Sequence, residues 1–181
     1  MSSLTLRLLP MVPVLALSFA AVGCHQTPGS TMRVQTNSAA ASNVARYRTY
    51  SHETADKAPR GYATTAMTAG TLDKVRADID MEMQKRGYVH AETGGDLTVR
   101  ISAGVRVVDD QPTGGAAQAG APSDQDRIGA LVVDIFDREN SGHLFHGYAR
   151  DELHTDSATD AQIRSAVTKI LAPLPAAGDL H

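Results

Sequence analysis

Residues 97–107 read Leu97-Thr98-Val99-Arg100-Ile101-Ser102-Ala103-Gly104-Val105-Arg106-Val107, and this stretch decides the fold. Apolar side chains alternate with polar or small ones along its whole length. Alternation with period two predicts a β-strand with one buried face and one wet face, which is typical of antiparallel sheets. We expect Gly104 to mark a bulge or a bend. A candidate contact surface is formed by the polar side chains Thr98, Arg100, Ser102 and Arg106.

Other strand signals lie on both sides of this segment. Residues 129–137 alternate again, residues 138–142 have the composition of a hairpin turn, and a return strand is expected over residues 143–153. Upstream, residues 44–50 form a β-rich alternating segment, and residues 52–70 are expected to form a loop. The segment 109–127 is rich in Gly, Ala, Pro, Gln and Asp, and we expect a mobile loop there.

Two helices are predicted. Thr71 is the expected N-cap of a helix that runs to Arg86 and stops at Gly87, with Glu82 and Arg86 paired on its exposed side. The second helix follows a capping box at residues 159–162 and ends before Pro173. Both helices have one apolar face, so the sequence predicts an α+β fold: a two-layer sandwich of an antiparallel sheet with two helices packed on one face.

The N-terminus indicates where the protein resides. Arg7 precedes an apolar run over residues 8–19, which is shorter than the ~20 residues that a membrane span needs and has the character of a secretory signal. Ala21-Val22-Gly23-Cys24 follows and resembles the lipobox of bacterial lipoproteins, which implies cleavage before Cys24 and acylation of that residue. The alternative is ordinary signal cleavage at residues 18–20, which would leave Cys24 as a spare thiol.

These features divide the chain into four parts. Residues 1–23 are expected to be a lipoprotein signal peptide, and residues 24–43 a lipidated tether with a possible short strand at 32–36. Residues 44–175 are expected to form a single α+β domain, and residues 176–181 a C-terminal tail. His25 is not the aspartate that retains some lipoproteins at the inner membrane, so we expect attachment to the outer membrane, facing the periplasm.

Composition narrows the possible partners. The net charge of −3 makes nucleic acid, or an anionic lipid surface bound by charge, an unfavourable partner. The expected partners are therefore the membrane, reached through the lipid on Cys24, and an unknown envelope protein. Since Cys24 is the single cysteine, its acylation leaves no thiol for a disulfide, a zinc site or a nucleophile.

No catalytic, cofactor-binding or metal-binding residue is assigned from the sequence. His143 and His146 lie three apart on an expected strand and should point to opposite faces. His146 and His154 share one face but lie roughly 26 Å apart. The carboxylates at positions 109, 110, 124 and 126 lack the spacing of an EF-hand, and the chain contains no Gly-x-Ser-x-Gly motif.

An ordered series of short motifs resembles the bacterial lipoprotein family built on domain of unknown function 4136. The motifs are Tyr47-Arg48-Thr49-Tyr50, Lys85-Arg86-Gly87-Tyr88, Asp96-Leu97-Thr98-Val99, residues 131–137, residues 142–147 and residues 170–175. Phe145 departs from the pattern, since the family tends to have Trp there. The resemblance implies a fold and an envelope location, but no activity and no site residues.

Three functions remain open on this basis. The first is a lipid-anchored envelope protein that acts by binding or assembly. The second is a periplasmic hydrolase with a site built from loop carboxylates and His146, which convergent polar residues in a pocket would favour. The third is a carrier of an apolar ligand, which a wide dry cavity between helices and sheet would favour.

Overall fold

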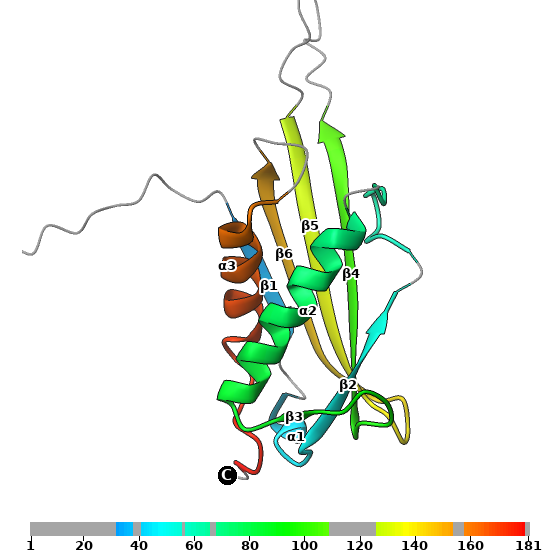
Figure 1. Cartoon of the computed structure of the whole chain (residues 1–181), viewed down its shortest axis with the longest axis vertical. Helices are drawn as coiled ribbons and strands as arrows, with labels where there is room; N and C mark the ends of the chain where they lie inside the picture. Colours follow the sequence, from blue (N-terminus) through cyan, green and yellow to red (C-terminus); the bar gives the residue numbers. More distant parts are fainter. Residues whose placement is uncertain are drawn as a thin grey trace, which may run out of the picture.

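The computed structural model of the chain describes residues 32–37, 41–55, 57–65, 68–108, 126–153 and 158–179, so the expected signal peptide and Cys24 lie outside the described residues. Within these ranges, six strands form one sheet in the order β1-β6-β5-β4-β2-β3, accompanied by three helices (Figure 1). None of these helices is both long and apolar enough to cross a bilayer. The elements in chain order are β1 (Arg33–Asn37), α1 (Ala41–Val44), β2 (Thr49–Thr54), α2 (Thr68–Lys85), β3 (Val89–His90), β4 (Leu97–Val108), β5 (Asp126–Asp137), β6 (His143–Leu153) and α3 (Asp160–Leu171).

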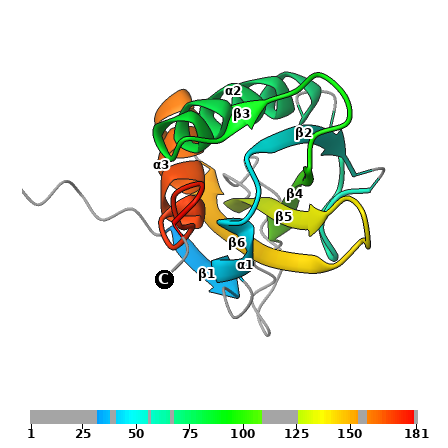
Figure 2. The same ribbon diagram turned by 90° about the horizontal axis from the view of Figure 1, so that it is seen from below.

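The centre of the sheet is the antiparallel meander β4-β5-β6, in which β4 pairs with β5 from Leu97–Asp137 to Val108–Asp126. Helices α2 and α3 contact each other, and they contact β4 and β6 respectively. Figures 1 and 2 show both helices running along the same side of the sheet. The fully buried side chains between them include Val99, Ile101, Val133, Ile135, Ile79, Val167 and Ile170. The α+β class is therefore confirmed.

The sheet is mixed, whereas the sequence predicted an antiparallel one. Strand β2 runs parallel to β4 on one side and parallel to β3 on the other. Parallel neighbours need a crossover connection, and here α2 supplies it between β2 and β3. The prediction was wrong because it assigned a loop to residues that form the end of β2 and so gave that strand no partner.

The segment 44–50 also differs from its predicted strand. Its first residues end the short helix α1 and turn, with Tyr47 N donating to the carbonyl of Val44 at 3.1 Å. Val44 and Ala45 are both fully buried. The alternation of apolar and polar residues in this segment therefore reflects a helix end and a turn that face the core, and not a strand. Strand β2 begins only at Thr49.

Helix α2 begins four residues earlier than predicted, at Thr68 rather than at Leu72 after a cap at Thr71. Thr68 is buried, and its Oγ1 accepts a hydrogen bond from the backbone N–H of Thr65 at 2.8 Å. The expected ion pair between Glu82 and Arg86 is present at 2.8 Å, but Glu82 is buried instead of exposed. Hydrogen bonds from Lys85 and Arg86 lower the pKa of Glu82 to about 2. The stop at Gly87 is confirmed by its φ of +83°.

Two residues of β4 behave differently from their sequence pattern. Gly104 pairs with Ala130 without any register shift, so no bulge occurs there. A Cβ at this position would lie 2.9 Å from both Ala58 Cβ and Tyr62 Cβ, so the lack of a side chain at Gly104 lets the segment that contains Ala58 and Tyr62 pack closely against β4. Val107 continues the apolar alternation but is 45% exposed.

The C-terminal elements follow the prediction closely. Strand β6 covers residues 143–153 as expected, and Thr159 forms the predicted capping box with Gln162 at the start of α3. Parts of the expected tether and tail join the domain. Strand β1 pairs with β6, and Ala177 N donates to the carbonyl of Arg86 at 2.8 Å.

The two faces of β4 should respond differently to truncation. Ile101 is fully buried, so Ile101→Ala should cost about 2–5 kcal/mol of unfolding free energy through lost burial and a cavity. Thr98 lies on the opposite face, and Thr98→Ala should change stability by less than ~0.5 kcal/mol. Urea denaturation of the two variants measures this difference, and the reverse ranking would contradict the assigned strand phase.

Candidate functional site

Polar and aromatic side chains collect on the face of the sheet that points away from α2 and α3, which we call the outer face. The predicted contact residues Thr98, Arg100 and Ser102 lie there, because they alternate with the buried positions of β4. The structure adds residues from β5 and β6 to them, namely Asp134, Phe136, His146 and Tyr148. Arg106 is exposed further along β4, with its guanidinium carbon 5.4 Å from the ring of Tyr62.

Arg100 is held in a layered arrangement on the outer face. Its guanidinium carbon lies 4.7 Å from the centroid of the Phe136 ring, and its Nη2 lies 3.1 Å from Oε2 of Glu53. Phe136 has a second neighbour in His143, whose ring stacks on it with 4.7 Å between the ring centroids. An arginine above an aromatic ring gains cation–π attraction of about 0.5–1 kcal/mol at exposed sites. The arrangement therefore presents the Arg100 charge in a preferred orientation.

His143 and His146 lie together, which corrects the prediction that they point to opposite faces. Nε2 of His143 and Nδ1 of His146 lie 2.9 Å and 2.7 Å from the same oxygen, Oδ1 of Asp134. The cause is a β-bulge: Phe136 pairs with His143 and Ile135 pairs with Phe145, which leaves Leu144 as an extra residue. The two consecutive apolar residues Leu144 and Phe145, both in contact with the core, are the sequence signal of this bulge.

The predicted link between His146 and the loop carboxylates lacks geometric support. His146 pairs across the sheet with Asp134, which lies eight residues along β5 from Asp126. At ~3.3 Å per residue, about 26 Å separate Asp126 from this position. The other carboxylates of the predicted loop, at positions 109, 110 and 124, lie outside the described residues.

Tyr62 and Tyr148 contact each other at one part of the outer face. Their hydroxyl oxygens lie 2.9 Å apart, and this contact joins the segment after β2 to β6. Burial, and then the hydrogen bond with Tyr62, raise the pKa of Tyr148 to about 12. The Tyr148 phenol is therefore neutral near pH 7 and acts as a hydrogen-bonding and apolar group.

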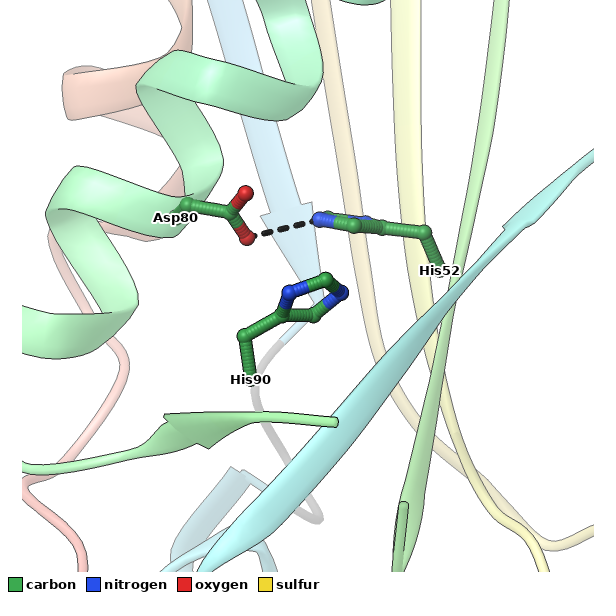
Figure 3. A group of neighbouring side chains, drawn as sticks. All are labelled: His52, Asp80 and His90. Carbon is green, nitrogen blue, oxygen red and sulfur yellow. Dashed lines mark hydrogen bonds and ion pairs between the residues drawn. The ribbon is translucent and has the colours of Figure 1, made fainter. Parts of the chain in front are cut away.

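A second cluster lies on the opposite side of the sheet, beneath α2, and consists of His52, Asp80, His90 and Tyr50. Figure 3 shows Asp80 extending from α2 toward His52 of β2, with His90 of β3 beside them. Nε2 of His52 lies 2.7 Å from Oδ1 of Asp80, and the hydroxyl of Tyr50 donates to the same oxygen at 2.6 Å. The two imidazole rings lie 5.0 Å apart.

Burial controls the protonation of this cluster. It lowers the pKa of His52 despite the hydrogen bond with Asp80, which opposes the shift. Burial and the same carboxylate raise the pKa of Tyr50. The contact between His52 and Asp80 is therefore a hydrogen bond from a neutral imidazole at neutral pH, with the proton on Nε2. The other nitrogen, Nδ1, is buried and has no hydrogen-bond partner among the described residues.

Sequence reasoning missed this cluster because it ended the strand at Tyr50. His52 continues the alternation that begins at Tyr50, and both residues face α2. Extending the strand by period two would have placed His52 on the helix side. The approach of His90 depends on the parallel pairing of β3 with β2, for which no local sequence signal exists.

Both clusters contain metal-ligating groups. In the described part of the chain, His52, Asp80 and His90 bring one possible ligand atom each to within 4.8 Å of one another. Asp134, His143 and His146 do the same on the outer face. Imidazole nitrogens with a carboxylate oxygen are ligands that zinc and related ions accept.

A small apolar cavity lies near the N-terminal ends of α2 and α3. Its volume is about 70 Å³, and its walls include Val75, Ala103, Leu131, Ala149, Ile163 and Ala166. Pockets that hold drug-sized ligands measure about 300–1,000 Å³. The cavity is therefore too small for the bulk of a lipid chain.

Fold comparison finds solved structures that resemble this chain at low sequence identity. A crystal structure of a PDZ domain protein from Parabacteroides distasonis aligns with a TM-score of 0.52 and 10% identity, over 82% of this chain and 36% of that one. Two structures of the PelC dodecamer from Paraburkholderia phytofirmans align with TM-scores of 0.49 and 0.48, at 15% and 11% identity, over 80% of this chain and 98% of theirs. No curated protein matches the chain.

The family assignment rests on the sequence model. Residues 34–176 match the model of the domain of unknown function DUF4136. The match extends from β1 to the segment after α3 and so includes every strand of the sheet. The chain belongs to this family.

The lowered pKa of His52 should make stability depend on pH. The folded protein keeps His52 neutral while the unfolded chain takes up a proton below about pH 6.5, so the free energy of unfolding should decrease as the pH falls through that value. The variant His52→Gln retains a donor toward Asp80 and should lack this contribution. Urea denaturation at several pH values, in a chelating buffer, compares the two proteins. Parallel pH profiles would contradict the assignment.

Proposed function

We propose that this protein is a lipid-anchored component of the bacterial cell envelope that acts by binding or assembly, without catalysis. In this proposal the domain is a two-layer sandwich, with α2 and α3 as one layer and the sheet as the other. The helices then occupy one sheet face, and the outer face is available to a partner.

The arrangement of Arg100, Phe136 and His143 is the observation that carries the proposal. Arginine and aromatic residues are enriched at the centres of protein interfaces and contribute most of the binding energy there. Arg100 and His143 keep 42% and 47% of their side-chain surface exposed. Because Phe136 and Glu53 already orient Arg100, binding costs less side-chain entropy than it would for a free arginine.

The partner that fits this face is a protein surface carrying carboxylates. Arg100 and Arg106 lie on the same strand and supply positive charge, while Phe136 and Tyr148 supply apolar area. Nucleic acid is a poorer candidate because the chain as a whole carries a net charge of −3.

The anchor positions this face near a membrane. Only eight residues lie between Cys24 and Arg33, where β1 begins, so these nine residue steps keep β1 within about 32 Å of the lipidated residue even for a fully extended chain. The proposed membrane is the outer membrane, with the domain facing the periplasm. Multiple acyl chains on Cys24, palmitate among them, would make this attachment stable.

Loss of the acylated thiol should release the protein. The variant Cys24→Ser has no sulfur to which the lipid can be attached, so it should appear in the soluble periplasmic fraction or remain as the unprocessed precursor. Metabolic labelling with palmitate and fractionation on a sucrose gradient measure both outcomes. Membrane retention equal to wild type, together with an unlabelled wild-type protein, would contradict lipid anchoring.

The outer face should be the face that contacts a partner in cells. A photo-crosslinking amino acid at Ser102, between Arg100 and Gly104 on the outer face, should give one dominant crosslinked protein. The same probe at Gln84, which is exposed on α2, should not give that product.

Two variants connect the crosslink to the proposed residues. Arg100→Ala and Phe136→Ala should each reduce the Ser102 crosslink by about thirtyfold, which corresponds to the ~2 kcal/mol typical of residues that dominate an interface. Lys169→Ala removes an exposed positive charge on α3 and should leave the yield unchanged. Crosslinking from Gln84 alone, or yields unaffected by both outer-face variants, would overturn the proposal.

A further inference from the structure

The cluster beneath α2 has a composition that the proposed binding function does not use. It joins two imidazoles and one carboxylate from three different elements, at the edge of the sheet where β3 is the last strand. Figure 3 shows that all three side chains turn inward toward a common point between the helix and the strands. His90 packs its ring against those of Tyr50 and His52, with centroid distances of 5.3 Å and 5.0 Å, and in this position a ring nitrogen lies within 4.8 Å of the ligand atoms of His52 and Asp80.

We propose that His52, Asp80 and His90 form a binding site for one divalent transition-metal ion of the zinc class. Nε2 of His52, an oxygen of Asp80 and a ring nitrogen of His90 are the three protein ligands. His90 is exposed, so the position beside it is open for water or a fourth ligand. Three protein ligands and one open position form a common arrangement for zinc.

The distances require only a small adjustment. Zinc–nitrogen and zinc–oxygen bonds of about 2.0–2.1 Å in a tetrahedron place neighbouring ligand atoms ~3.3 Å apart. His52 Nε2 and Asp80 Oδ1 now lie 2.7 Å apart, at hydrogen-bond distance. A small rotation of Asp80 separates them, or Oδ2 becomes the ligand while Oδ1 keeps the hydrogen bond from Tyr50.

The surroundings of the ligands are already ordered. Tyr50 is fully buried, and its hydroxyl orients the carboxylate of Asp80 at 2.6 Å. The backbone on both sides of His90 is fixed to β2, since Val89 N donates to the carbonyl of Arg48 and Ala91 N donates to that of Tyr50, each at 2.8 Å. Such outer contacts hold metal ligands in position and strengthen binding.

Two features limit the affinity. Binding through Nε2 moves the proton of His52 to Nδ1, which is buried and has no hydrogen-bond partner among the described residues. Arg76, one turn before Asp80 on α2, opposes a cation, although its guanidinium is already paired with Asp73. We therefore expect a dissociation constant on the order of micromolar, weaker than that of a structural zinc site with four protein ligands.

This site reverses the expectation from the sequence that no metal ligands converge. That expectation weighed His143, His146 and His154, and it left His52 and His90 out. The proposal does not depend on the partner proposed for the outer face.

Zinc titration of the full-length protein in detergent, after removal of metal with a chelator, tests the site. His90→Ala changes an exposed residue and should preserve the fold while lowering zinc affinity at least about tenfold. Tyr50→Phe keeps the buried ring and removes the hydroxyl, and it should weaken binding by about 10–100-fold. His146→Ala, in the histidine pair on the outer face, is the matched control and should leave the His52 site intact.

Calorimetry gives the affinity and the number of ions bound, and zinc should also raise the melting temperature of the wild type by more than that of His90→Ala. If the outer-face histidines bind a second ion, wild type takes up two ions and His90→Ala takes up one, which still supports the site. No zinc binding by the wild type, or binding that is lost in His146→Ala and retained in His90→Ala, would overturn the proposal.

Discussion

The parallel pairing of β2 with β4 is the constraint on which both faces of the sheet depend. It aligns Tyr50 with Leu97 and Glu53 with Arg100, so the side chains of consecutive residues in β2 lie on opposite faces of the sheet. Tyr50 and His52 point under α2 and meet Asp80, while Glu53 points outward and pairs with Arg100. A shift of β2 by one residue would exchange these directions, because the side-chain period of a strand is two. The metal-ligating cluster and the orientation of Arg100 therefore have a common structural origin.

Packing makes this pairing stable. Tyr50 of β2 and the α2 residues Ile79 and Met83 are all fully buried in the same core. Apolar side chains of α2 and β2 therefore pack together next to the cluster of His52, Asp80 and His90. The burial that stabilises the fold also disfavours charge on His52 and lowers its pKa. On the outer face, which points away from α2 and α3, the two histidines beside Asp134 keep more than 40% of their side-chain surface exposed. The same kinds of ligating groups therefore exist in two different environments within one small domain.

The features that the sequence predicts well are local ones. The alternation along β4, the hairpin before β6 and the capping box at Thr159 each depend on residues close together in the chain, and each is found in the structure. The parallel direction of β2 depends on a helix-length crossover, and the convergence of His143 with His146 depends on one extra residue, Leu144. A prediction from the two-residue period of a strand fails at such a bulge, because the extra residue moves every later residue of the strand to the opposite face. Outer-face charges were predicted, whereas Phe136, which orients Arg100, was not.

The direction and register of β2 are open to direct measurement by NMR couplings across hydrogen bonds. Ala55 N–H donates to the carbonyl of Ile101 at 2.9 Å, and Ala91 N–H donates to that of Tyr50 at 2.8 Å. In uniformly ¹⁵N,¹³C-labelled protein, we predict scalar couplings from the Ala55 nitrogen to the Ile101 carbonyl carbon and from the Ala91 nitrogen to the Tyr50 carbonyl carbon. In an antiparallel pair, later residues of β2 would instead couple to earlier residues of β4. Couplings between β2 amide nitrogens and β4 carbonyl carbons in that order would show that the two strands are antiparallel. That result would contradict the placement of His52 beneath α2 and of Glu53 beside Arg100.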